Sequence, residues 1–320
     1  MKIDWKTMKR PIVALSPMAD MTDSAFCRLT KSIASPIVFR EMVSAEAVIR
    51  GNDKTLGMAA IHNEERPLVQ QIFGANVDSM REAARIIDRD FHPEGIDINM
   101  GCPVYKITSN FNGAALMKDV ELATAIVRAM KEVITVPLSV KMRAGWSDHN
   151  ECVEFAKAIE AAGADLITVH GRTKEQGYSG KARRDVVKAV KDAVLIPVLY
   201  NGDVFTWQDY FEALDETDCD GVLIARGGLG NPWIFKQIEE KLSGKVPEDI
   251  TLVGRIDTVR IHLDLHLAQH GEDRLPTFRK HLSWYFKGIP GFKAYRTKMM
   301  VAPDRETLEA IFDSLLKEEA

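Results

Sequence analysis

Residues 68–87 read LVQQIFGANVDSMREAARII, and within them the pattern of apolar residues changes from that of a strand to that of a helix. The first seven residues form a largely apolar run, which is typical of a parallel strand covered by helices. Asn76 stands where a helix N-cap is expected, and the apolar residues behind it recur at helical spacing: Met80, Ala83, Ala84 and Ile87. The stretch therefore predicts a strand, a turn and an amphipathic helix.

The same unit recurs through the first 240 or so residues. We predict strands at 12–18, 37–42, 68–74, 95–100, 138–142, 165–170, 197–201 and 221–225. The intervening helices carry boundary signals, since Asp119 can cap one helix and Gly163 can end the next. Eight consecutive βα units match an α/β fold of the (β/α)8 TIM-barrel type. An open, doubly wound sheet is the alternative, but eight repeats favour closure.

The pattern changes near residue 244. Residues 243–247 (SGKVP) have the composition of a linker, and a long amphipathic helix follows, marked by Leu252, Ile256, Val259, Leu263 and Leu267. Further helical segments are predicted near 274–286, 291–300 and 304–318. We therefore predict a catalytic barrel over residues 1–243 and a small all-helical domain over 244–320.

Charge is distributed unevenly along the chain. The net charge of −4 argues against a molecule that is basic throughout, so any binding of nucleic acid must use a local patch. Residues 274–303 hold seven Lys or Arg, six aromatic residues and no Asp or Glu. A charge run is often only a solvated surface, but this length without an acidic residue favours contact with RNA phosphates.

The four cysteines, Cys27, Cys102, Cys152 and Cys219, lie far apart and form no C-x-x-C pair. This spacing argues against a structural zinc site and against a disulfide framework, and free thiols suit a reducing cytoplasm. The N-terminus is charged where a signal peptide needs an apolar core, and no uncharged apolar run approaches the roughly 18 residues of a membrane span. We expect a cytoplasmic monomer with no metal and no membrane contact.

Unusual polar residues stand at the ends of the predicted strands. In a barrel the loops after the strands surround a common pocket, so these side chains should converge there. The segments are SPMAD (16–20), QQ (70–71), NMGCP (99–103), KMR (141–143), HGRT (170–173), NGD (201–203) and ARGG (225–228). The glycine turns after strands seven and eight, together with Arg226, favour a phosphate site, although glycines can also simply make tight turns.

Lys141 and His170 each allow two interpretations. Lys141 interrupts an apolar run, so it either points into the barrel mouth, where it can stabilise an anion, or turns outward with its charge in solvent. His170 is either a structural hydrogen-bonding residue or a ligand contact. The adjoining segment 171–173, and Gln71 across the barrel, favour the ligand contact.

Cys102 is the strongest candidate for chemistry among the cysteines. It follows a strand, between a glycine and a proline, where neither helix nor sheet continues, so its thiol should be partly exposed and fixed in direction. The thiol could act as a nucleophile or as a proton donor. Cys27, Cys152 and Cys219 fit packing positions.

Taken together, the motifs resemble the tRNA-dihydrouridine synthase family in its bacterial form. They are SPMADMTD (16–23), QIFG (71–74), DINMGCPV (97–104), GAALMKD (113–119), VKMRAGW (140–146), TVHGRT (168–173), NGD (201–203), GNPWIF (230–235) and RKHLSWY (279–285). The resemblance spans nearly the whole chain in the same order. Its most specific part is N-x-G-C-P followed by VHGRT.

The resemblance implies an FMN-dependent oxidoreductase that uses NADPH to reduce the C5=C6 bond of particular uridines in tRNA. Cys102 corresponds to the family's catalytic cysteine, which gives a proton to C5. The implied FMN contacts are Pro17, Met18, Ala19, Gln71, Lys141, His170, Asn201, Gly202, Asp203, Ala225 and Arg226. The implied substrate contacts are Asn99, Arg143, Arg279, Lys280 and Lys287, the last three in a tRNA-binding helical domain. The uracil must leave its stack to reach the barrel mouth.

Two positions depart from the family pattern. Asp20-Met21 stands where Gly-Val is expected, and Asp20 is interpreted as a cap of the first helix. Ala225 stands where glycine is usual, and its N–H remains available if φ stays negative. The alternative function is another FMN-barrel oxidoreductase that acts on a small molecule and lacks a basic helical segment. A non-catalytic RNA-binding barrel is disfavoured by Cys102, Lys141 and His170.

Overall fold

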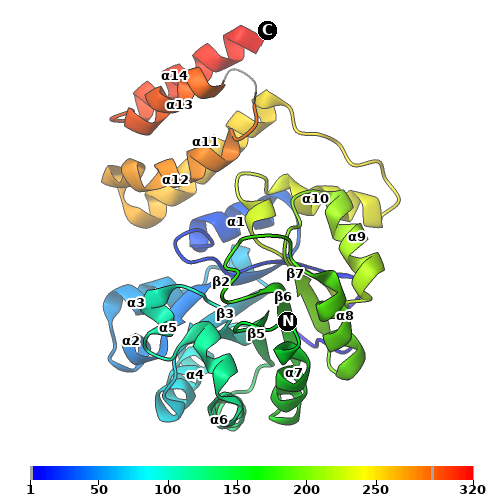
Figure 1. The fold of residues 1–320 in the computed structure, drawn as a ribbon. Coiled ribbons are helices and arrows are strands. Elements are labelled where there is room, and N and C mark those ends of the chain that lie inside the picture. Colours follow the sequence, from blue (N-terminus) through cyan, green and yellow to red (C-terminus); the bar gives the residue numbers. More distant parts are fainter. Residues whose placement is uncertain (1–2, 290–291, 320) are drawn as a thin grey trace.

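The computed structural model describes residues 3–289 and 292–319 of the chain. Eight parallel strands pair in sequence order and β1 closes on β8, so that they form a barrel (Figure 1). The strands are β1 (Ile12–Leu15), β2 (Ile37–Ser44), β3 (Leu68–Phe73), β4 (Gly95–Met100), β5 (Leu138–Gly145), β6 (Leu166–Thr173), β7 (Val198–Asn201) and β8 (Gly221–Ile224). The predicted (β/α)8 fold is confirmed, and each predicted strand is present with ends that shift by three residues at most.

Helices cover the outside of the barrel. They are α1 (Ser24–Ile33), α2 (Ala45–Ile49), α3 (Asp53–Ala59), α4 (Val77–Phe91), α5 (Tyr105–Thr108), α6 (Val120–Lys131), α7 (Glu151–Ala161), α8 (Arg184–Ala193), α9 (Trp207–Thr217) and α10 (Trp233–Leu242), with 3-10 turns η1 (Asn63–Glu65), η2 (Gly113–Lys118) and η3 (Arg226–Gly228). The predicted caps are confirmed: the side chains of Asn76 and Asp119 each accept a backbone N–H at 2.9 Å. Gly163 follows the end of α7 with a φ of +107°, which favours glycine.

The interpretation of Asp20 as the cap of the first helix is wrong. Asp23 caps α1, because its backbone is extended and its carboxylate accepts the N–H of Phe26 at 3.0 Å. Asp20 lies in the preceding turn with a φ of +60°, and its N–H donates to the Glu41 carboxylate at 2.7 Å. A capping residue must directly precede the first helical turn, and Asp20 lies too early in the chain.

The inside of the barrel changes from apolar to polar along its axis. Successive residues of a strand point alternately inward and outward. One end of the interior holds a cluster of buried apolar residues: Ile3, Trp5, Ile12, Ala14, Ile37, Phe39, Val69, Leu166, Leu199 and Leu223. Two residues further along three of these strands, Gln71, Asn201 and Ala225 line a cavity. The strand register therefore sets where the core ends and where polar groups begin.

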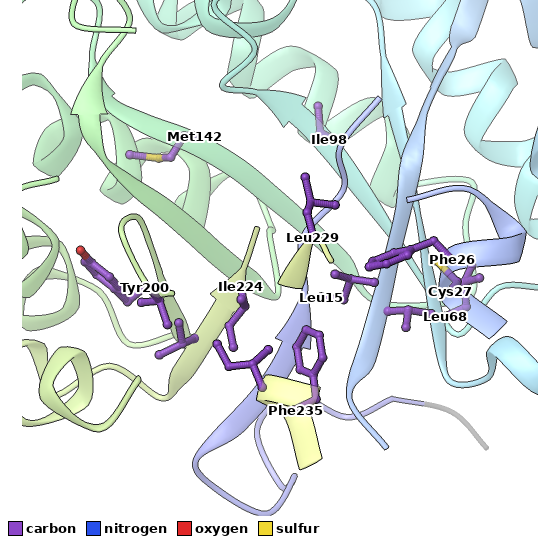
Figure 2. Packing of buried hydrophobic residues seen from close by; sticks show 14 of the residues in the cluster. Leu15, Phe26, Cys27, Leu68, Ile98, Met142, Tyr200, Ile224, Leu229 and Phe235 are labelled. Carbon is purple, nitrogen blue, oxygen red and sulfur yellow. The ribbon is translucent and has the colours of Figure 1, made fainter. Parts of the chain in front are cut away.

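A larger apolar cluster lies between the strands and the helices (Figure 2). Leu15 of β1, Ile224 of β8 and Phe235 of α10 are fully buried within it. A Cβ built on Gly228 would lie 3.3 Å from the Phe235 ring and 3.6 Å from Leu15, so the turn η3 rests against both side chains. This packing holds the loop after β8 in place.

Four further helices follow the barrel: α11 (Leu252–His270), α12 (Leu275–Tyr285), α13 (Phe292–Val301) and α14 (Arg305–Glu319), with the turn η4 (Glu272–Arg274) after α11. All five predicted apolar positions of α11 are buried, so the predicted amphipathic helix is confirmed. Residues 243–251 form neither helix nor strand. The domain division at 243/244 stays a prediction.

The first barrel helix makes an extensive contact with the additional helices. α11 and α12 lie over α1 (Figure 1), and the Phe26 ring centroid lies 5.4 Å from that of His262 and 6.1 Å from that of His281. The backbone N–H of Ala25 also donates to the Gln269 side chain at 2.8 Å. Among the residues that the structure describes, no helix combines the length and apolarity needed to cross a membrane.

The pairing of β8 with β1 leaves no room for a side chain at Gly221. A Cβ built there would lie 2.2 Å from the carbonyl oxygen of Ile12, its partner in register. We expect Gly221→Ala to lower the free energy of unfolding by about 1–3 kcal/mol, the usual cost of overpacking. Gly57→Ala is the control, because nothing lies within 4 Å of its Cβ position in α3, and it should raise stability by about 0.5–1 kcal/mol. Urea unfolding measures both, and equal midpoints would contradict the packing argument.

Candidate active site

A cavity of about 360 Å³ lies at the C-terminal ends of the barrel strands. The structure places fourteen of the predicted site residues in its wall: Pro17, Met18, Ala19, Gln71, Asn99, Cys102, Lys141, Arg143, His170, Asn201, Gly202, Asp203, Ala225 and Arg226. Met42 of β2 also lines it, so all eight strands contribute to the wall directly or through the loop that follows them. The other three predicted contacts, on and after α12, lie outside this wall.

Lys141 points into the cavity, so the outward-facing interpretation is wrong. Its Nζ donates to Asn201 Oδ1 at 3.1 Å, and Asn201 Nδ2 donates to the carbonyl of Leu223 at 2.6 Å, which fixes the amide. Burial, together with the nearby guanidinium of Arg143, lowers the pKa of Lys141 to about 8. A buried lysine in such surroundings gains stability from an anionic ligand.

A buried chain of hydrogen bonds adjoins the cavity. Asp97 accepts bonds from Ser139 Oγ at 2.5 Å and from Gln71 Nε2 at 2.6 Å, and Gln71 Oε1 accepts from Asn99 Nδ2 at 2.8 Å. Burial raises the pKa of Asp97 to about 6, although both donors act in the opposite direction. The chain fixes the orientations of the Gln71 and Asn99 amides before any ligand arrives.

Cys102 follows β4, and its backbone is held on both sides. Asn99 Oδ1 accepts the N–H of Cys102 at 2.9 Å and that of Gly101 at 3.1 Å. The carbonyl of Cys102 accepts the N–H of Ala114 at 3.1 Å. The side chain is partly exposed and lines the cavity, as predicted. A fixed, accessible thiol of this kind can donate a proton or attack an electrophile.

The other three cysteines are buried, which confirms their prediction as packing residues. Burial raises the pKa of Cys152 to about 12 and that of Cys219 to about 11, and it also raises the pKa of Cys27 well above its usual range. Their thiols therefore stay protonated and enclosed.

Arg143 joins two loops of the barrel mouth. Its guanidinium donates to the carbonyls of Gly101 at 2.8 Å, Thr173 at 2.7 Å and Gly177 at 2.9 Å. These bonds tie the cysteine loop after β4 to the loop after β6. Arg143 thus helps to fix the position of Cys102, because it binds the carbonyl of the preceding residue, Gly101.

Asp203, at the turn after β7, organises two arginines. Its carboxylate accepts from Arg172 at 2.9 and 2.7 Å, from Arg226 at 3.2 Å and from the N–H of Ala182 at 2.8 Å. Partial burial acts to raise the pKa of Asp203, but the bonds from Arg172 and Ala182 lower it overall. Asp203 therefore keeps Arg226 at the cavity rim. Arg172 also binds Asp203, and the sequence assigned it no role although it lies in the HGRT motif (170–173).

The backbone forms part of the wall near the same turn. Gly202 has a φ of +136°, and a Cβ built there would lie 2.5 Å from Ala182 Cβ and 3.2 Å from the His170 ring. Glycine is therefore required at position 202, because Ala182 and His170 occupy the space that a side chain would take. The φ of Ala225 is −104°. This value is negative, as expected if the backbone N–H of Ala225 is to remain available to a ligand. Gly202 and Ala225 both line the cavity.

His170 and Tyr178 form an aromatic side of the cavity. Their ring centroids lie 6.3 Å apart, and the Arg226 guanidinium lies 4.4 Å above the Tyr178 ring. Burial lowers the pKa of His170 well below its usual value, with further lowering by Lys141 and nearby arginines, so the ring is neutral. The sequence did not identify Tyr178 as a site residue, because it lies in a loop beyond the polar motifs at the strand ends. The one sequence feature that marks it is an aromatic residue between Gly177 and Gly180.

Two of the predicted RNA contacts have structural partners in the fold. The Nζ of Lys280 donates to the carbonyl of Asp20, next to the cavity wall. Arg279 donates to the carbonyl of Ala302 at 2.8 Å, between α12 and the segment before α14. Both side chains therefore stabilise the position of α12.

Lys287 differs from them because it is exposed. Its Nζ lies 5.4 Å from the Trp284 ring, and with Ser283, Phe292 and Arg296 the two residues line a surface hollow of about 420 Å³. Trp284 is partly buried, and a cation beside an accessible edge or face of an aromatic ring is a pairing that single-stranded nucleic acid uses.

Comparison with known proteins identifies the relatives of this chain. A family model described as dihydrouridine synthase matches residues 13–319. The probable tRNA-dihydrouridine synthase of Rickettsia conorii is 34% identical over 313 residues, covering 95% of this chain and 94% of that protein. The tRNA-dihydrouridine synthase B of Pasteurella multocida is 33% identical over 311 residues, covering 95% and 93%.

Solved structures with the same fold are more distant in sequence. The old yellow enzyme homologue of Zymomonas mobilis superposes with a TM-score of 0.54 at 13% identity, covering 80% of this chain and 94% of that one. The histamine dehydrogenase of Rhizobium sp. 4-9 superposes with a TM-score of 0.57 at 13% identity, covering 79% and 48%. At this identity the likeness extends to the barrel fold alone.

Proposed function

The chain belongs to the dihydrouridine synthase family, and we propose that it reduces particular uridines of tRNA to 5,6-dihydrouridine with a flavin as hydride donor. One observation carries the proposal: Cys102 is a held, partly exposed thiol in the wall of a cavity that also contains Lys141 and Arg226. The named activity of the relatives from Rickettsia conorii and Pasteurella multocida supports tRNA as the substrate.

FMN is the proposed resident cofactor and NADPH its proposed reductant. The cavity volume falls in the range of about 300–1,000 Å³ that small-ligand sites occupy. The backbone of Gly202 in the cavity wall and the guanidinium of Arg226 suit a phosphate, and Lys141 suits the negative charge of a reduced flavin. The remaining proposed contacts are Pro17, Met18, Ala19, Gln71, His170, Asn201, Asp203 and Ala225.

A reduced flavin, when bound, supplies a hydride to C6 of the uracil. The product needs a proton at C5, and the thiol of Cys102 donates it as the S–H bond breaks and the C5–H bond forms. The thiolate then regains a proton from solvent, to which the side chain is partly exposed. Asn99 and Arg143 are proposed as positioning residues, because both hold the backbone beside the cysteine.

The helical domain proposed over residues 244–320 binds the tRNA outside the cavity. Lys287 and Arg296 are exposed around the hollow with Trp284 and can contact phosphates there. Arg279 and Lys280 contribute by fixing α12. The target base must leave its stack to enter the barrel mouth.

Removal of the proposed acid tests the mechanism. We expect Cys102→Ala to lose about 10²–10⁴-fold in dihydrouridine formation on tRNA, the usual contribution of general acid catalysis. Flavin content and reduction of the flavin by NADPH should persist, since neither step uses the thiol. Cys152→Ala is the matched control and should keep full turnover. Full turnover by Cys102→Ala would rule out the mechanism, and turnover of free uridine at the rate of tRNA would favour a small-molecule oxidoreductase.

The lowered pKa of Lys141 predicts proton uptake on cofactor binding. Lys141 of the flavin-free protein loses its charge as pH rises through about 8, whereas a bound anion stabilises the ammonium. Affinity for FMN should therefore fall above pH 8, by up to about tenfold per pH unit for one proton. Lys141→Met should bind FMN more weakly at pH 7 and show no such fall. Flavin fluorescence quenching between pH 7 and 9 measures both proteins, and parallel pH profiles would reject the role of Lys141.

Charge removal tests the proposed tRNA surface. We expect the double variant Lys287→Ala/Arg296→Ala to raise KM for tRNA and to reduce the slope of log affinity against log salt by up to about 2, because each lost phosphate contact releases roughly one counterion fewer. The control Lys157→Ala/Arg81→Ala removes a lysine and an arginine from the exposed faces of α7 and α4 and should change neither quantity. An unchanged salt slope in the first variant would show that the hollow is not a phosphate contact.

A further inference from the structure

Three potential metal ligands meet where α11 crosses the start of α1. Asp23 is the N-cap of α1 on the barrel, and His266 and His270 stand one turn apart on α11. Each of the three offers one ligand atom, and these atoms lie within 4.8 Å of one another. The group joins parts of the chain that are up to 247 residues apart in sequence.

The pair Asp23–His270 already has almost the required spacing. Asp23 Oδ2 and His270 Nε2 lie 3.0 Å apart, while Asp23 Oδ1 accepts the capping N–H of Phe26. A Zn²⁺ ion bound at about 2.0–2.1 Å in tetrahedral geometry holds its ligand atoms roughly 3.3–3.4 Å apart. A small separation of the two side chains, with the Nε2 proton of His270 moved to Nδ1 or released to solvent, therefore admits an ion without disturbing the helix cap.

His266 presents an unshared lone pair. Thr277 Oγ1 donates to the carbonyl of Arg274 at 2.7 Å, so in its 2.8 Å contact with His266 Nε2 the hydroxyl oxygen is the acceptor. With the Thr277 hydroxyl donating to Arg274, the tautomer of His266 protonated at Nε2 satisfies both contacts and leaves the lone pair on Nδ1. Among the described residues no hydrogen-bond partner reaches His266 Nδ1, although this side chain is 1% exposed. A buried acceptor without a donor costs free energy, and a cation would supply the missing partner.

The group is open to solvent on one side. Asp23 and His266 are buried, whereas His270 is exposed, which leaves a path for an ion from solvent to the three ligand atoms. Asp23 contributes the carboxylate of the group, and one of its two oxygens faces His270 rather than the cap of α1.

We propose that Asp23, His266 and His270 bind one divalent transition-metal ion, with Zn²⁺ as the best match to two imidazoles and one carboxylate. A water completes the coordination on the exposed side. The ion acts as a structural clamp between the barrel and the helical domain, and it stands apart from the proposed reductase chemistry. The expectation of no metal rested on cysteine spacing, which takes no account of histidines that meet a distant aspartate.

Metal titration of the full-length protein tests the site. The protein is treated with EDTA, dialysed and titrated with Co²⁺ and then Zn²⁺, while the visible d–d absorption and the melting temperature are followed. We expect one ion per chain, a tetrahedral Co²⁺ spectrum that Zn²⁺ displaces, and a higher Tm with metal. His270→Gln keeps a donor for Asp23 but loses the imidazole, and it should bind at least about tenfold more weakly.

Two further variants make the outcome decisive. His92→Asn removes an imidazole at the far end of α4 and tolerates the φ of +50° there, so its metal binding should equal that of the parent protein. Asp23→Asn keeps a capping side chain and should lose metal affinity even if His270→Gln folds poorly. Equal Co²⁺ affinity in parent, His270→Gln and Asp23→Asn, a thiolate-to-cobalt charge-transfer band, or no saturable binding below about 1 mM would each overturn the proposal.

Discussion

Pairing of β1 with β8 closes the sheet, and the arrangement of the cavity depends on that closure. The two strands approach so closely at Gly221 that the carbonyl of Ile12 occupies the place of a Cβ. Because all eight strands are parallel, closure brings their C-terminal ends to one rim. Pro17 and Arg226, from opposite ends of the barrel sequence, thereby line the same cavity.

The rim concentrates polar groups that would be costly if they lacked partners. Lys141 is paired with Asn201, Asp97 with Ser139 and Gln71, and Arg143 with three backbone carbonyls. These partners are protein groups, so the side chains that face the cavity are oriented in advance. Such preorganisation makes charged groups more effective in a binding site. The same bonds hold the Cys102 loop between β4 and β6.

The segment that links β1 to α1 serves two parts of the molecule. Pro17, Met18 and Ala19 lie in the cavity wall, and a few residues later the carbonyl of Asp20 accepts a bond from Lys280 of α12. Asp23 then contacts His270 of α11. A displacement of α11 or α12 would therefore act directly on the cavity wall. The helices α11 and α12 are thus joined to the segment that forms part of the cavity wall.

The sequence by itself determined the elements, the fold class and the polar residues of the strand ends. Hydrophobic periodicity, the caps at Asn76 and Asp119 and the turn at Gly163 are local signals, and each depends on residues within one or two turns of chain. Tertiary structure alone decided which distant side chains bind one another: that Lys141 faces Asn201, and that Asp203 holds two arginines. It also decided the meeting of Asp23 with His266 and His270. These contacts depend on strand register, barrel closure and helix packing. Such packing brings together residues that are far apart in the sequence, and no local pattern around either residue identifies its partner.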